Sequence, residues 1–177
     1  PENNPDLAGD GKLGEDWAII RHGLSIKKYP ACYGTHRAID AMLDLVGAHP
    51  VKLEDVRKVS VHFSSLTSNV LRNRQPDTGL AAKFSMEFAM ASGLIARRVS
   101  LAELTDPFVQ RKDVQDMMRR VERDLTDDTD EANPGSAPWE QVKIELVSGQ
   151  VLESEQVTRA RGHAERPLTD SQLHEKF

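Results

Sequence analysis

Two cations, a phenol, a thiol and an imidazole lie close together near the beginning of the sequence. They belong to Lys27, Tyr29, Cys32, His36 and Arg37. A helix is predicted to begin within this stretch, and a helix N-terminus presents unpaired backbone N–H groups and the positive end of the helix dipole. Carboxylates bind at such ends. The spacing therefore predicts a carboxylate site, with charge from Lys27 and Arg37 and a proton carried by His36, aided or oriented by Tyr29.

A strand and a helix must position these side chains. Alternation of apolar and polar residues predicts a half-buried strand over 24–29, with Lys27 and Tyr29 on one face and Pro30 as its end. The helix has Thr35 as a preferred N-cap and ends at Gly47. Its apolar residues recur at helical spacing and predict a buried face: Ala38, Ile39, Met42, Leu45 and Val46.

Lys83 is a second candidate anion ligand. It precedes Ser85, the predicted N-cap of a helix that runs to about Arg97 and is rich in small residues. Small side chains permit close packing, which predicts a central position for this helix. A simpler interpretation applies to both sites. In it, Lys27, Arg37 and Lys83 are ordinary solvated side chains, and His36 merely caps the first turn of the earlier helix.

A nucleophilic pair formed by Cys32 and His36 is a third possibility. The two residues straddle the predicted junction of loop and helix, and no orienting carboxylate is evident nearby in the sequence. The pattern favours the carboxylate site over this pair.

The remaining patterns predict an α+β domain with an antiparallel sheet of about four strands, covered on one face by helices. The strand patterns occur at 24–29, 56–63, 142–146 and 151–157. The helical patterns occur at 66–71, 85–97, from Asp106, at 114–121 and after the capping box at Thr169. The acidic run 124–131 lacks the spacing of a calcium loop and is interpreted as a solvated loop.

Composition limits the classes of function. The net charge of −5 disfavours general nucleic-acid binding, and no apolar run is long enough to span a membrane. One cysteine excludes an internal disulfide, and no metal-binding spacing occurs. No signal peptide is visible. From these features we expect a cytoplasmic, metal-independent protein with a small-molecule or protein partner.

Domain organisation follows from length and from the two ends. Residues 1–16 are interpreted as a linker, and residues 17–177 as a single α+β domain whose 38% hydrophobic content supports one core. The short helix at the C-terminus is marginal without a packing partner. We therefore expect a fragment of a longer two-domain protein, truncated within a C-terminal helix.

Three stretches resemble the MmgE/PrpD family, whose members include 2-methylcitrate dehydratase, cis-aconitate decarboxylase and iminodisuccinate epimerase. They read KKYPACYGTHRAIDA (27–41), PDTGLAAKFSMEFAMASGLI (76–95) and RPLTDSQLHEKF (166–177). The family combines an all-helical domain with a smaller α+β domain, and its active site lies between them. This chain resembles the smaller domain, with Lys27 matching the active-site lysine and His36 the histidine of a Thr-His pair. Cys32 stands where the decarboxylase branch has histidine.

The resemblance implies an active-site-capping domain of a cofactor-independent dehydratase, decarboxylase or epimerase. Such an enzyme abstracts a proton next to a carboxylate of a small polycarboxylate, and the sequence does not choose among the three reactions. The implied site residues are catalytic His36, Lys27 and Tyr29, with Arg37, Lys83 and Cys32 joining Lys27 in substrate binding.

The missing N-terminal helical domain is expected to complete the site, so the chain alone should be inactive. The full-length protein is expected to be a homodimer. The alternative is a non-catalytic module that binds an acidic ligand or a partner chain.

Overall fold

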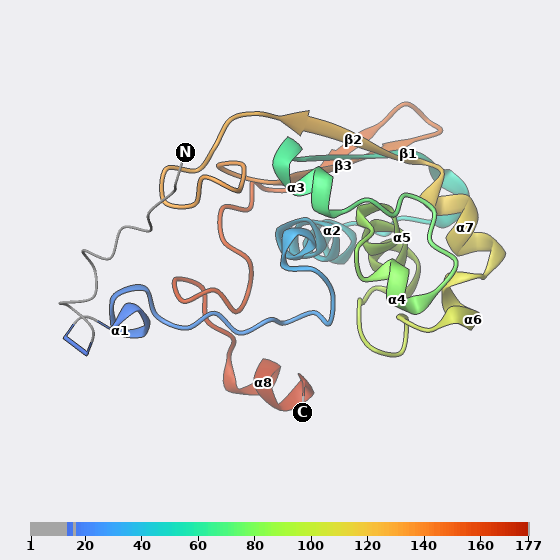
Figure 1. Ribbon diagram of the computed structural model, residues 1–177. Helices are drawn as coiled ribbons and strands as arrows, with labels where there is room; N and C mark the ends of the chain where they lie inside the picture. Colours follow the sequence, from blue (N-terminus) through green and yellow to red (C-terminus); the bar gives the residue numbers. More distant parts are fainter. Residues whose placement is uncertain (1–13, 16, 177) are drawn as a thin grey trace, which may run out of the picture.

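A mixed four-stranded sheet forms one layer of the computed structural model, which describes residues 14–15 and 17–176 (Figure 1). The strand order is β2-β1-β3-β4. β1 pairs with β2 in parallel and with β3 antiparallel, and β3 pairs antiparallel with β4. The strands are β1 Val56–Ser64, β2 Val121–Thr126, β3 Gln141–Leu146 and β4 Val151–Glu153. The predicted α+β class is confirmed, with a sheet that is mostly antiparallel.

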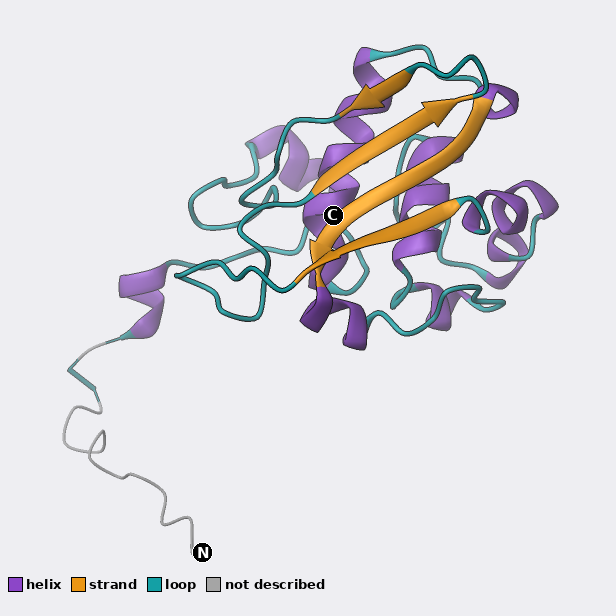
Figure 2. Ribbon diagram, turned by 90° about the horizontal axis from the view of Figure 1, so that it is seen from above, coloured by secondary structure: helices purple, strands orange, loops and turns teal. Residues whose placement is uncertain are grey.

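Period-2 alternation in β1 sends one set of side chains into the core. Val59, Val61 and Phe63 are fully buried, as predicted. Figure 2 looks down on the other face of the sheet, which the helices leave uncovered. That face carries cross-strand ion pairs such as Lys58 with Glu122 at 3.1 Å. The helices therefore cover one face of the sheet, in agreement with the prediction.

The helical layer contains two long helices and several short ones. Helix α5 is buried along nearly its whole length and packs against α2, which also contacts β3. A side chain at Gly93 would bring its Cβ within 2.9 Å of Met42, so this close approach depends on glycine. The helices are α1 Ala18–His22, α2 His36–Ala48, α3 Ser65–Val70, α4 Gly79–Ala82, α5 Met86–Ala96, α6 Asp106–Val109, α7 Lys112–Met118 and α8 Asp170–Lys176, with 3-10 turns η2 Tyr33–Thr35 and η3 Leu53–Asp55.

Local capping predictions are confirmed where the sequence patterns are strongest. The Ser85 hydroxyl accepts from the Phe88 amide at 3.0 Å, and Thr169 and Gln172 form both bonds of a capping box at the start of α8. Thr35 does occupy the N-cap position of α2, but its hydroxyl donates back to the Cys32 carbonyl at 2.8 Å. The turn η2 precedes the helix, which ends one residue after Gly47.

Two predictions about strands are wrong. Residues 23–27 form no strand, and the Ile26 amide instead donates to the carbonyl of Gly162 at 2.7 Å. The fourth strand is β2, which begins at Val121 and takes in the start of the run interpreted as a solvated loop. This edge strand has largely exposed side chains, so it lacks the apolar alternation that identifies a half-buried strand.

Strand β4 is shorter than the strand predicted at 151–157, since it ends at Glu153. Beyond β4, Glu140 and Val157 form an isolated antiparallel β-bridge. Most of the predicted linker, residues 1–13 and 16, lies outside the described residues, as does Phe177.

Candidate active site

The phenol of Tyr29 is buried and bound to an internal carboxylate. Its hydroxyl donates to Asp40 Oδ1 at 2.6 Å. Burial raises the pKa of Tyr29 well above its usual value, and the negative charge of Asp40 acts in the same direction. Tyr29 is therefore a protonated donor near neutral pH. Because no strand forms here, Tyr29 and Lys27 do not share the predicted strand face.

Lys27 lies at the surface, two residues before Tyr29. Its Nζ donates to the Ala31 carbonyl at 3.3 Å, and no acidic group pairs with it among residues 14–15 and 17–176. An exposed lysine without an acidic partner keeps its charge available to a ligand. Of the two cations close to the start of α2, Lys27 is exposed whereas Arg37 is buried.

The imidazole of His36 is fully buried beneath the loop that precedes α2. Its ring lies 5.2 Å from the ring of Tyr29, edge-on, and 4.9 Å from the ring of Tyr33. Within the described chain, neither ring nitrogen has a hydrogen-bond partner. Burial lowers the pKa of His36 to about 4. The charge of Lys27 acts in the same direction, and the backbone of Ala31 acts in the opposite direction. His36 is therefore neutral at pH 7 and is covered by its own loop.

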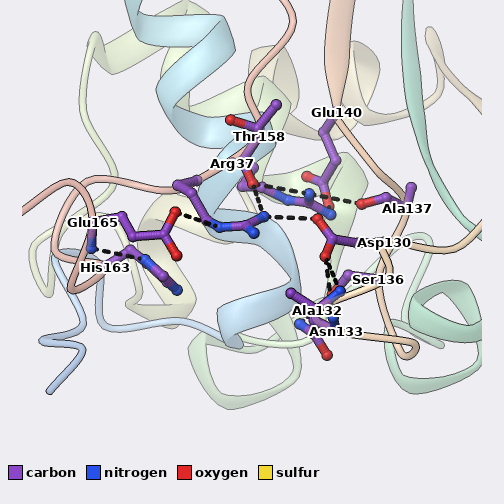
Figure 3. A network of polar contacts seen from close by, with 11 residues as sticks. Arg37, Asp130, Ala132, Asn133, Ser136, Ala137, Glu140, Thr158, His163 and Glu165 are labelled. Atoms are coloured by element: carbon purple, nitrogen blue, oxygen red, sulfur yellow. Dashed lines mark hydrogen bonds and ion pairs between the residues drawn. The ribbon is translucent and has the colours of Figure 1, made fainter. Parts of the chain in front are cut away.

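The N-terminus of α2 already has a carboxylate close to it, that of Glu140. The Nη2 atom of Arg37 lies 3.0 Å from Glu140 Oε1, and Nη1 donates to the carbonyls of Ala137 and Thr158 (Figure 3). Burial raises the pKa of Glu140 to about 7, while Arg37 and the backbone of Ala38 act in the opposite direction. The guanidinium of Arg37 and the helix end are thus engaged inside the protein.

Cys32 and Lys83 meet through the backbone. The Cys32 amide donates to the Lys83 carbonyl at 2.9 Å, which places Lys83 beside the loop that carries Lys27. Lys83 occupies the C-cap position of α4, and the hydroxyl of Ser85 caps α5. The backbone of Lys83 therefore lies beside the Cys32 loop, although Lys83 is not itself the residue at the N-terminus of α5.

A recess of about 840 Å³ opens beside this loop. Cys32, Tyr33 and Arg37 line it, whereas Lys27, Tyr29, His36 and Lys83 do not. A volume of this size is typical of small-molecule sites. The predicted residues thus divide into a surface group at Lys27, a buried group at His36 and Tyr29, and a group in the recess.

A second polar cluster, missed by the sequence reasoning, lines the same recess. Arg159 lies 2.7 Å from Asp130 and 3.2 Å from Glu165. The Nδ1 atom of His163 accepts from the Glu165 amide at 3.1 Å (Figure 3). These residues come from two loops far apart in the sequence, so no local pattern joins them. In the described residues, no group of three or more His, Cys, Asp or Glu is arranged to hold a metal ion.

Asp40 is another residue that sequence reasoning missed, although a signal for it exists. Its neighbours on α2 are apolar and buried, whereas Asp40 is a buried charged residue. These neighbours are Ala38, Ile39, Ala41 and Met42. A carboxylate at a buried helix position requires donors around it. That requirement would have identified Asp40 as part of a polar network.

The comparisons place most of the chain within one family. Residues 29–177 match the family model described as the MmgE/PrpD C-terminal domain. A search of curated proteins finds no match. The matched region includes Tyr29, Cys32, His36 and Lys83 and begins two residues after Lys27. None of the described helices is long and apolar enough to cross a membrane.

Proposed function

The chain belongs to the MmgE/PrpD family as a C-terminal domain, and from this membership we propose that it is the active-site-capping half of a cofactor-independent enzyme. Its substrate is a small polycarboxylate, and the helical domain of the same protein supplies the rest of the site. The assembled protein is a cytoplasmic homodimer.

The observation that carries this proposal is the position of Lys27. Its charge lies at the surface without an acidic partner among the described residues, on the loop that leads to Cys32 and the recess. Tyr33, Leu66 and Val70 line that recess and are also exposed. Large apolar side chains around a polar recess are typical of a surface that another element covers. This supports a site that is completed by a second domain.

The proposed chemistry begins with removal of a proton from the carbon next to a carboxylate. Negative charge then develops as the enolate forms, and a fixed cation stabilises this charge. Lys27 supplies that cation, and Cys32 and Lys83 contact the substrate beside it. Loss of hydroxide from the adjacent carbon then gives a dehydratase, and reprotonation on the other face gives an epimerase. In a decarboxylase the enolate is reprotonated at a different carbon before CO₂ leaves, and a second proton takes the place of CO₂.

His36 and Arg37 take less direct roles in this geometry. We propose that His36 exchanges a proton with the substrate only when the loop 29–33 moves off its ring, since both ring nitrogens are buried. Tyr29 orients His36 through their edge-on contact. Arg37 contributes by holding Glu140 at the recess. It contacts substrate only if its ion pair with Glu140 breaks.

A non-catalytic module that binds an acidic ligand or a partner chain is the second candidate. The burial of His36 and the internal pairing of Arg37 favour it, because both groups are withdrawn from solvent. The two candidates differ in one observable property, namely exchange of the substrate proton.

Reconstitution tests the proposal. The 177-residue chain, the helical domain of its parent protein and a mixture of the two are incubated with small di- and tricarboxylates in D₂O. Proton NMR then follows exchange or turnover at the carbon next to the carboxylate, which detects all three reactions. The proposal predicts activity in the mixture and none in either part. Exchange by this chain alone at the rate of the mixture would overturn the shared site, and binding without exchange in the mixture would favour the non-catalytic module.

A further inference from the structure

Asp40 is a fully buried carboxylate on α2 that is surrounded by donors. Oδ1 accepts from the Tyr29 hydroxyl at 2.6 Å and from Arg161 Nη1 at 3.1 Å. Oδ2 accepts from the Arg161 amide at 2.6 Å and lies 3.5 Å from Arg166 Nη1. Every neighbour of the carboxylate in this network is a donor, which only an ionised acid can satisfy on both oxygens.

These contacts join three segments that are distant in the sequence. Tyr29 lies on the loop between Lys27 and Cys32, Asp40 lies on α2, and Arg161 lies near the C-terminus of the domain. The same C-terminal loop contacts the Lys27 loop directly, through the Ile26 amide and the Gly162 carbonyl. Asp40 is thus the point at which the loop, the helix and the C-terminal segment are tied together.

We propose that Asp40 is a positioning residue, which acts through Tyr29 and Arg161 to fix the loop 26–33 and so sets where Lys27 and Cys32 face. The relevance of this role to catalysis rests on the proposed function, in which Lys27 contacts substrate. The positioning itself does not depend on that function. It can be measured without any substrate.

Substitution of Asp40 by asparagine has a specific consequence. Asparagine offers one acceptor oxygen and one NH₂ group, so in either orientation its NH₂ faces donors. Either Tyr29 or the Arg161 amide then loses its acceptor. Because these groups are buried or partly buried, the loss should weaken the attachment of the loop to α2.

Asp44 provides a matched control one turn later on the same helix. It is half exposed and pairs with the same two arginines, at 2.5 Å from Arg161 Nη2 and 4.0 Å from Arg166 Nη2. Among the described residues, its ion-pair partners are these two arginines and not Tyr29. Asp44→Asn therefore removes the same charge from the same helix and network while leaving the Tyr29 attachment intact.

Cys32 provides the reporter, because it is the only cysteine in the sequence and lies half-buried on the loop in question. The rate at which its thiol reacts with a chromogenic disulfide reagent measures how often the loop opens. We expect Asp40→Asn to raise this rate about tenfold or more, as the loss of one buried hydrogen bond would. Asp44→Asn should stay within about twofold of the wild type.

Three further variants separate positioning from general destabilisation. Tyr29→Phe should also raise the thiol rate, and its combination with Asp40→Asn should raise the rate by less than the product of the two single effects, because both substitutions disrupt one connected network. Ile144→Val loosens the core elsewhere and should leave the rate near that of the wild type once urea unfolding has been used to account for stability.

Equal thiol rates for Asp40→Asn and Asp44→Asn would overturn the proposal. So would a rise in Asp40→Asn that Ile144→Val reproduces at equal stability. In a catalytically active two-domain protein, Asp40→Asn should lower kcat/KM but add little to the loss caused by Lys27→Ala. If Lys27→Ala is fully active while the thiol rates behave as expected, the proposed function fails and the positioning role stands.

Discussion

The carboxylate of Glu140 lies 3.0 Å from the guanidinium of Arg37, although 103 positions separate the two residues in the chain. Both side chains are buried where α2 begins. The protein therefore places one of its own carboxylates at the helix end that the sequence predicts as a site for a substrate carboxylate. Of the two cations predicted to bind that carboxylate, Arg37 is therefore already paired, and Lys27 remains the expected substrate contact.

Above pH 7, where Glu140 is ionised, Arg37→Ala should destabilise the domain by about 3–5 kcal/mol, because it leaves Glu140 as an unpaired buried charge. The double variant Arg37→Met/Glu140→Leu should recover most of that loss. Lys112→Ala is the control, since its pair with Asp116 is exposed and should contribute little to stability. Urea unfolding measures all three, and a small effect of Arg37→Ala alone would contradict the buried pair.

His36 should make the fold less stable as the pH falls from about 6.5 to about 4. In the unfolded chain its imidazole takes up a proton near 6.5, whereas in the folded chain its pKa is lowered to about 4. The unfolded state binds more protons between these values, so stability rises with pH across that window. His36→Phe should remove this rise in the pH profile of unfolding free energy. If the two profiles rise equally between pH 4 and pH 6.5, the folded protein accommodates a charged imidazole, which would contradict the lowered pKa.

Glu140 should act in the opposite direction over much of the same range. Its pKa is raised from 4.5 to about 7 in the folded state. The folded state then binds more protons between these values, so stability falls as the pH rises through them. Glu140→Gln should abolish this fall and leave the rise due to His36 exposed in the profile. A Glu140→Gln profile that matches the wild type would contradict the raised pKa.

Gly162→Ala should destabilise the domain more than Gly149→Ala. Both glycines have positive φ, +90° and +87°, so each substitution carries about 1–2 kcal/mol of backbone strain. A Cβ at Gly162 would lie only 2.0 Å from the Ile26 carbonyl oxygen, whereas a Cβ at Gly149 would meet nothing within 4 Å. Urea unfolding compares the stability of the two variants. Equal losses would show that the loop carrying Lys27 moves away from the new Cβ without loss of stability.

Local signals account for most of what the sequence predicts correctly. The N-cap at Ser85, the capping box at Thr169 and the alternation in β1 act over a few residues, so the local sequence pattern alone reveals them. The alternation at 24–29 predicts a strand that does not form, because the backbone of this segment bonds to Gly162 and does not join the sheet. The edge strand β2 carries no apolar alternation, so its pairing with β1 is visible only in three dimensions.

The site was predictable only in part, because its side chains are partnered over long distances in the chain. The sequence places Lys27 and Cys32 shortly before a helix whose first turn contains His36, and the structure agrees. It gives no sign that His36 is covered by Tyr29 and Tyr33, since burial depends on how the loop folds back. The partner of Arg37 also comes from a distant segment, beyond the reach of any local pattern.

Steady-state kinetics of Lys27→Ala in the two-domain protein test the central claim most directly. Lys52→Ala is the control, because Lys52 is an exposed lysine outside the proposed site. If Lys27 holds a substrate carboxylate and stabilises the developing enolate, Lys27→Ala should raise KM and lower kcat together, and Lys52→Ala should change neither. Circular dichroism confirms that both variants fold. Unchanged KM and kcat in Lys27→Ala would contradict the account.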